Sequence, residues 1–200
     1  MSETDNMNVQ ERLYFIESMI QEGRKCTDYW GWTFLLWGVG YLIAIGWTYL
    51  LPHPQYAWPI VMIATAVASV WIARWKHRHH PQPKTTQSRA LTGIWSATGI
   101  AIFIFAFSGA LGGHGEPHLF LAGIEIFIGL ANAASAVTLR WRPQFLVALV
   151  WWAAGVASCT VSVEHLIPVL IVATLIGNIG FGLYLMRRET IGRPRQVSHA

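Results

Sequence analysis

The sequence predicts an all-α membrane protein: a bundle of six transmembrane helices preceded by a cytoplasmic amphipathic helix. Three observations indicate this class. The 200-residue chain is only 12% charged and 54% hydrophobic, whereas a soluble domain usually has about 25% charged residues. It contains 11 Trp, a residue that is enriched at membrane–water interfaces. Six apolar stretches follow one another, each near the ~20 residues that a helix needs to cross a bilayer.

We expect three parts along the chain. Residues 1–29 form a cytoplasmic segment, residues 30–186 form the six-span transmembrane domain, and residues 187–200 form a basic cytoplasmic tail. The start of the chain is polar and acidic, and it lacks a short apolar core followed by a small-residue cleavage site. No cleavable signal peptide is therefore predicted.

Residues 9–22 predict the amphipathic helix, because Val9, Leu13, Ile16 and Ile20 recur at helical spacing. The polar face of this helix is acidic, whereas helices that lie on anionic lipid are normally rich in Lys and Arg there. We therefore expect Leu13, Ile16 and Ile20 to contact protein. The contacted surface is either a cytoplasmic loop of the same chain or another membrane or cytoplasmic protein.

The distribution of basic residues predicts the topology. The predicted spans are residues 30–51, 57–75, 90–111, 118–138, 144–160 and 166–186. All 14 Lys and Arg lie before the first span, around the connections of spans two to three and four to five, or after the sixth span. The other three connections contain none. Because basic residues are retained in the cytoplasm, both termini are expected there.

The fourth span contains a polar stripe within an apolar helix. His118, Glu125 and Asn132 are spaced by seven residues, so they lie within about 20° of one another around the helix axis. Asn178 adds a polar group inside the sixth span. An ionisable residue inside a span is a functional candidate, here a proton- or ion-responsive site or a polar cavity open to the outside. The alternative is a hydrogen bond between helices that fixes their packing.

The predicted outer connections carry candidate metal ligands. These are His114, Glu116, His118 and His165. Imidazole and carboxylate together suit a transition metal, but no H-E-x-x-H or C-x-x-C spacing is present. We predict no resident cofactor, with a transition metal on the outer face as the alternative.

The sequence contains no Walker A, GxGxxG, GxSxG or paired-cysteine motif. Its basic residues lie in short connections, so a nucleic-acid partner is not expected. We therefore favour a non-enzymatic scaffold, accessory subunit or sensor that lies in the lipid bilayer and acts through protein contacts, including self-association into a homo-oligomer. The alternative is a small transporter or an ion- or metal-binding protein that uses Glu125 and the outer His and Glu residues.

Residues 16–47 carry a resemblance to a family of small bacterial six-span membrane proteins. In that family an I-E-x-M-I amphipathic helix leads into an F-x-L-W-G first span. The matching residues here are Ile16, Glu17, Met19, Ile20, Phe34, Leu36, Trp37 and Gly38. The resemblance implies a multi-pass protein of the bacterial inner (cytoplasmic) membrane. The family has no assigned activity, so no functional residue is carried over from it.

Overall fold

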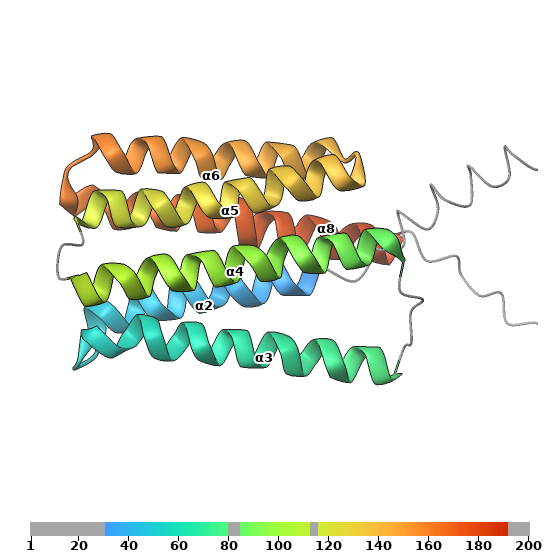
Figure 1. Ribbon diagram of the computed structural model, residues 1–200, viewed down its shortest axis with the longest axis horizontal. Coiled ribbons are helices and arrows are strands. Elements are labelled where there is room, and N and C mark those ends of the chain that lie inside the picture. Colours follow the sequence, from blue (N-terminus) through green and yellow to red (C-terminus); the bar gives the residue numbers. More distant parts are fainter. Residues whose placement is uncertain (1–30, 80–84, 113–115, 192–200) are drawn as a thin grey trace, which may run out of the picture.

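The structure, a computed structural model, describes residues 31–79, 85–112 and 116–191, and these contain helices and no strand (Figure 1). The first five spans are α2 (Gly31–Leu50), α3 (Ala57–His79), α4 (Thr86–Gly112), α5 (Pro117–Leu139) and α6 (Arg142–Thr160). The sixth span comprises α7 (Leu166–Thr174), η3 (Leu175–Gly180) and α8 (Phe181–Ile191). Two 3₁₀ turns, η1 (Pro54–Tyr56) and η2 (Val163–His165), lie in connections between spans.

Six helices in the described ranges are long and apolar enough to cross a membrane. The chain is thus a multi-pass membrane protein, and the predicted all-α bundle is confirmed. Two helices extend further than hydropathy predicted, since α3 reaches His79 and α4 begins at Thr86. Hydropathy marks where apolar side chains end, whereas the backbone ladder continues through polar residues whose side chains reach water.

Some sequence predictions fall outside the described residues. The amphipathic helix over residues 9–22, with Leu13, Ile16 and Ile20, is among them. His114 and the tail beyond Ile191 are also outside. Predictions on these segments stay predictions.

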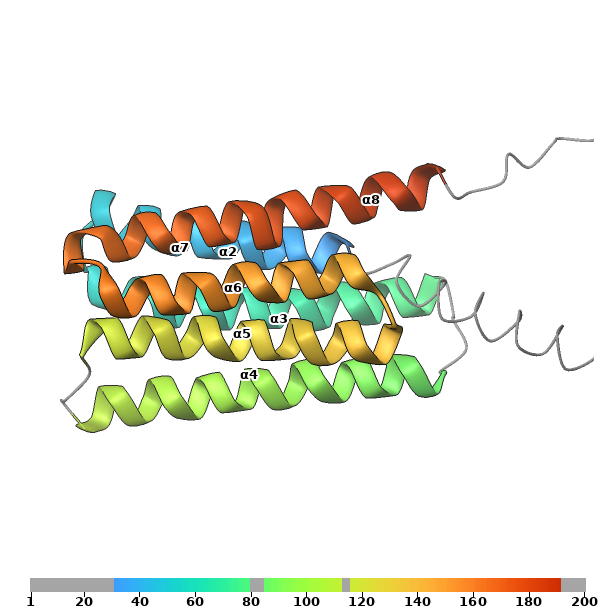
Figure 2. The same ribbon diagram turned by 90° about the horizontal axis from the view of Figure 1, so that it is seen from above.

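The long helices run side by side along the axis of the bundle (Figures 1 and 2). The α5–α6 pair forms an antiparallel hairpin, α2 packs against α3 and α8, and α4 packs against α5. We call the end of the bundle with Glu116 and Glu164 the acidic end. The opposite end, with Arg140 and Arg188, is called the basic end.

The α5–α6 hairpin turns at Arg140, whose backbone is left-handed with φ 49°. The amide of Arg140 donates to Val137 O at 3.1 Å, and the amide of Trp141 donates to Ala136 O at 2.9 Å. These two bonds form a Schellman motif, which satisfies the last carbonyl groups of α5. The motif reverses the chain within two residues and brings α6 alongside α5.

The core is centred on Trp151 of α6, which is fully buried. Its ring lies 6.4 Å from that of Tyr41 on α2, and it packs on Gly177, where an added β-carbon would lie 2.6 Å from Trp151 Nε1. Gly177 belongs to η3, a π-helical turn that interrupts the sixth span. A single α-helix was predicted for this span, because a local change of helix type leaves the apolar composition unchanged.

Candidate functional site

The acidic group of the fourth span lies in the α5–α6 interface. Glu125 is fully buried, and Ser158 Oγ donates a hydrogen bond of 2.7 Å to Glu125 Oε2. Glu125 is eight residues from Pro117, which places it about 12 Å along α5 from the acidic end. The carboxylate therefore faces protein, at a depth where lipid chains surround the bundle.

Small residues let α5 and α6 approach closely around this carboxylate. A β-carbon on Gly155 would lie 3.8 Å from the Glu125 β-carbon and 3.1 Å from Ile126 Cγ1. One turn further along the pair, the Trp152 ring occupies the space next to Gly129 and donates from Nε1 to Ile126 O at 3.3 Å. The interface thus combines close backbone packing with polar contacts, as is common between helices in lipid.

The other polar residues of the stripe have separate partners. His118 Nε2 lies 3.0 Å from Val161 O and ties the start of α5 to the end of α6. Asn132 is fully buried, and its amide donates to Ile128 O of its own helix at 3.0 Å. Glu125 and Asn132 face the protein interior and His118 is half-buried. The three side chains do not share one hydrogen-bond network among the described residues.

Asn178 lies on η3, which packs against α2 and α6. It is 5% exposed, and its β-carbon packs against α2 where Gly38 leaves room, since a β-carbon on Gly38 would lie 2.9 Å from it. No hydrogen bond within the described ranges joins Asn178 to Glu125. The two residues that the sequence placed at depth therefore belong to different interfaces.

Several buried polar atoms have no hydrogen-bond partner among the described residues. They are Glu125 Oε1, Asn132 Oδ1 and Ser135 Oγ on α5, Trp151 Nε1 on α6, Thr174 Oγ1 on α7 and Trp95 Nε1 on α4. Sequence reasoning missed the contributions of Ser135, Trp151, Ser158 and Thr174. A signal was present for two of them, because Trp151 and Ser158 are spaced by seven, like the residues of the α5 stripe.

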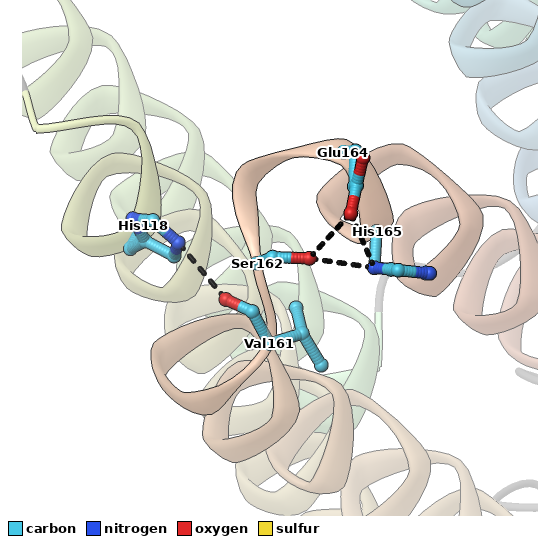
Figure 3. A network of polar contacts seen from close by, with 5 residues as sticks. All are labelled: His118, Val161, Ser162, Glu164 and His165. Atoms are coloured by element: carbon cyan, nitrogen blue, oxygen red, sulfur yellow. Dashed lines mark hydrogen bonds and ion pairs between the residues drawn. The ribbon is translucent and has the colours of Figure 1, made fainter.

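The turn at the acidic end forms a second polar cluster (Figure 3). Ser162 Oγ lies 2.7 Å from His165 Nδ1 and 3.2 Å from Glu164 Oε1. Both contacts are satisfied together when His165 Nδ1 donates to Ser162 Oγ and the hydroxyl donates to Glu164. This arrangement differs from a Ser–His–acid catalytic triad, in which serine and acid bind opposite nitrogens of the imidazole. It joins three side chains of the turn that leads into α7.

The predicted metal ligands do not converge within the described residues. His118 Nδ1 lies 3.8 Å from Glu116 Oε1, whereas His165 is bonded to Ser162. No group of three His, Cys, Asp or Glu side chains in the described ranges is placed to hold a metal ion. The fourth proposed ligand, His114, lies outside those ranges.

Comparison with known proteins adds no relative: no protein-family model, no curated protein and no solved structure matches the chain. Its function must therefore be inferred from its own residues. The described residues offer a buried Glu125–Ser158 pair, a polar cluster in the turn at the acidic end, and two helices, α3 and α4, with largely uncovered apolar faces.

Proposed function

We propose that the chain is a non-enzymatic membrane protein that acts as a scaffold, accessory subunit or sensor through contacts with another transmembrane helix. The resemblance of residues 16–47 to a family of small bacterial six-span membrane proteins supports a bacterial inner-membrane location. The segregation of Lys and Arg supports cytoplasmic termini. The amphipathic helix predicted over residues 9–22, with its acidic polar face, would add a second contact surface to this proposal.

The observation that carries the proposal is the low burial of α3 and α4. Only 17% of the apolar stretch of α3 and 6% of that of α4 are buried, against 50% in α5. Each helix lies at the edge of the bundle in one of the two views (Figures 1 and 2). Large apolar side chains of α4 that are exposed are Ile100, Phe103, Ile104 and Phe107. Most of the apolar surface of α3 and α4 is therefore not covered by the other described helices and is available to a partner.

The outer face of α3 has a shape suited to a helix. A shallow groove of about 560 Å³ follows it, lined by Ile60, Ile63, Ala64, Val67, Ala68 and Trp71. Ala64 and Ala68 are spaced by four and lie between larger side chains. This small-xxx-small pattern lets a second helix backbone approach closely, which favours helix association in lipid.

The Glu125–Ser158 pair also supports this proposal, because its position indicates a role in helix packing. The carboxylate is enclosed between α5 and α6 and accepts a hydrogen bond from Ser158. A polar contact in this position stabilises the packing of two helices. It gives less support to the alternative of a transporter or ion-binding protein, which needs a carboxylate that its ligand can reach.

The proposal is tested by photocrosslinking in native membranes. A photoreactive amino acid replaces Ala64 or Val67 in the α3 groove, and Leu130 or Leu149, at similar depth on exposed faces of α5 and α6, in matched controls. We expect one discrete protein adduct from the groove positions and only lipid adducts from the controls. An adduct of two copies of the chain identifies self-association as the contact.

Shape is tested by filling the groove. Ala64→Leu with Ala68→Leu adds bulk between the larger side chains and is expected to abolish the adduct formed from Val67. Equal adducts from groove and control positions, or an adduct that survives the double substitution, contradicts the proposed contact.

A further inference from the structure

The α5–α6 turn at the basic end contains two arginines, one before and one after a tryptophan in the sequence. Arg140 occupies the left-handed position of the Schellman turn, Trp141 follows it, and Arg142 begins α6. Both arginine side chains are exposed. Their backbone positions are fixed by the turn, so the two guanidinium groups are held at the same end of the bundle as Trp141.

A third guanidinium group reaches the same ring from the far end of the chain. The Arg188 guanidinium carbon lies 5.8 Å from the centre of the Trp141 ring. Tyr184, one turn earlier on α8, stacks on Trp141 with ring centres 6.4 Å apart and planes 17° apart. Phe181 adds a ring contact of 5.5 Å. These contacts dock the last turns of α8 on the α5–α6 turn and bring Arg188 to the same end of the bundle as Arg140 and Arg142.

Within the described ranges, no ion pair involves Arg140, Arg142 or Arg188. Glu116 precedes α5 and Glu164 lies between α6 and α7, so both lie at the end opposite the α5–α6 turn. A group of three exposed guanidinium groups at a membrane surface attracts anions.

The start of α6 adds hydrogen-bond donors to this group. Its N-cap residue, Trp141, makes no side-chain cap, and no acidic residue lies in its first turn. Gln144, in the same turn, is 3% exposed. A helix N-terminus without a cap leaves backbone amides available to an anion.

The aromatic residues indicate which anion fits. Trp and Tyr lie at the depth of lipid headgroups, and the planar guanidinium group binds phosphate oxygens in pairs. At that depth the phosphates are those of lipid. We propose that Arg140, Arg142 and Arg188, together with Trp141 at the basic end, bind the headgroup of an anionic phospholipid. The site is independent of the proposed protein contact on α3.

The test uses the full chain in nanodiscs of phosphatidylcholine with phosphatidylglycerol as the probe, with retained lipids counted by native mass spectrometry. The test variant combines Arg140→Gln, Arg142→Gln and Arg188→Gln. The control combines Arg74→Gln, Arg78→Gln and Arg89→Gln, which removes the same charge at the same end of the bundle. Loss of one basic group from the proposed site is expected to lower its affinity for anionic lipid about fivefold. We therefore expect the test variant to lose phosphatidylglycerol occupancy by about tenfold or more, and the control to retain it.

Further measurements separate binding from folding and lipid from free anion. Thermal unfolding in pure phosphatidylcholine is expected to be alike for test and control variants. Inorganic phosphate at millimolar concentration is expected not to displace the lipid. The proposal is overturned if wild type retains phosphatidylcholine as well as phosphatidylglycerol, if both triple variants lose the lipid equally, or if phosphate or an acidic protein replaces it. If the test variant does not fold, the preference of the wild-type chain for phosphatidylglycerol over phosphatidylcholine still tests the proposal.

Discussion

Ser158 on α6 donates its hydroxyl to the carboxylate of Glu125 on α5 at 2.7 Å, and both side chains are fully buried. The bond joins residues 33 positions apart and is the only hydrogen bond to the Glu125 side chain in the described part of the structure. Removing one partner leaves the other buried without a hydrogen bond, which costs more free energy than the bond itself contributes.

The first prediction therefore concerns Ser158→Ala. We expect it to lower the free energy of unfolding by about 1–3 kcal/mol, because the buried carboxylate loses its donor. Ser69→Ala is the control, since Ser69 donates only to Thr65 O of its own helix; we expect a change of no more than about 0.5 kcal/mol. Unfolding in bicelles by steric trapping gives both values.

The double variant Ser158→Ala with Glu125→Met checks the mechanism. An apolar residue of similar length removes the need for a donor, so the two changes are expected to be less harmful together than their sum. The coupling is expected near 0.6 kcal/mol and no more than about 1.7 kcal/mol, the range measured for such bonds in membranes. Simple additivity would show that the pair does not stabilise the interface.

The second prediction concerns the contact between Trp151 and Gly177. A β-carbon at position 177 would lie 2.6 Å from Trp151 Nε1, and the indole is fully buried and has no room to move away. Gly177→Ala is therefore expected to destabilise the bundle by about 1–3 kcal/mol through overpacking. Thermal unfolding in detergent measures the change.

Gly99→Ala is the matched control for this contact. Nothing lies within 4 Å of a β-carbon at position 99, and alanine favours a helix over glycine by about 0.8–1.0 kcal/mol. We expect Gly99→Ala to be neutral or stabilising. Equal effects of the two substitutions would mean that Trp151 does not pack on η3 as described.

The third prediction concerns metal at the acidic end. His118 is engaged by Val161 O and His165 by Ser162, so we expect EDTA to leave the unfolding temperature unchanged and the purified chain to contain less than one equivalent of zinc or copper. Elemental analysis and thermal unfolding measure the two quantities. A full equivalent of metal that His118→Ala removes would instead support the metal-binding alternative.

The sequence was sufficient to predict the spans and the inward face of α5. Hydropathy and helical spacing depend on one helix at a time, so they locate Glu125 and Asn132 on a common face. The partner of Glu125 could not be predicted, because the register between two helices depends on both. Ser158 meets Glu125 only because Gly155 and Ala122 let α6 approach α5 at that level. The π turn at Gly177 is a local backbone geometry, and the Ser162–His165 contact joins two side chains. Composition encodes neither.

The left-handed turn at Arg140 has a consequence for the basic end. Glycine adopts this conformation without cost, whereas any other residue strains the backbone by about 1–2 kcal/mol. Arginine here makes the hairpin slightly harder to close and gives it a charge at its tip. A phospholipid bound to that tip would return part of the lost stability, so the hairpin would be firmest in membranes rich in anionic lipid. The bilayer would then act as a ligand of the fold as well as its solvent.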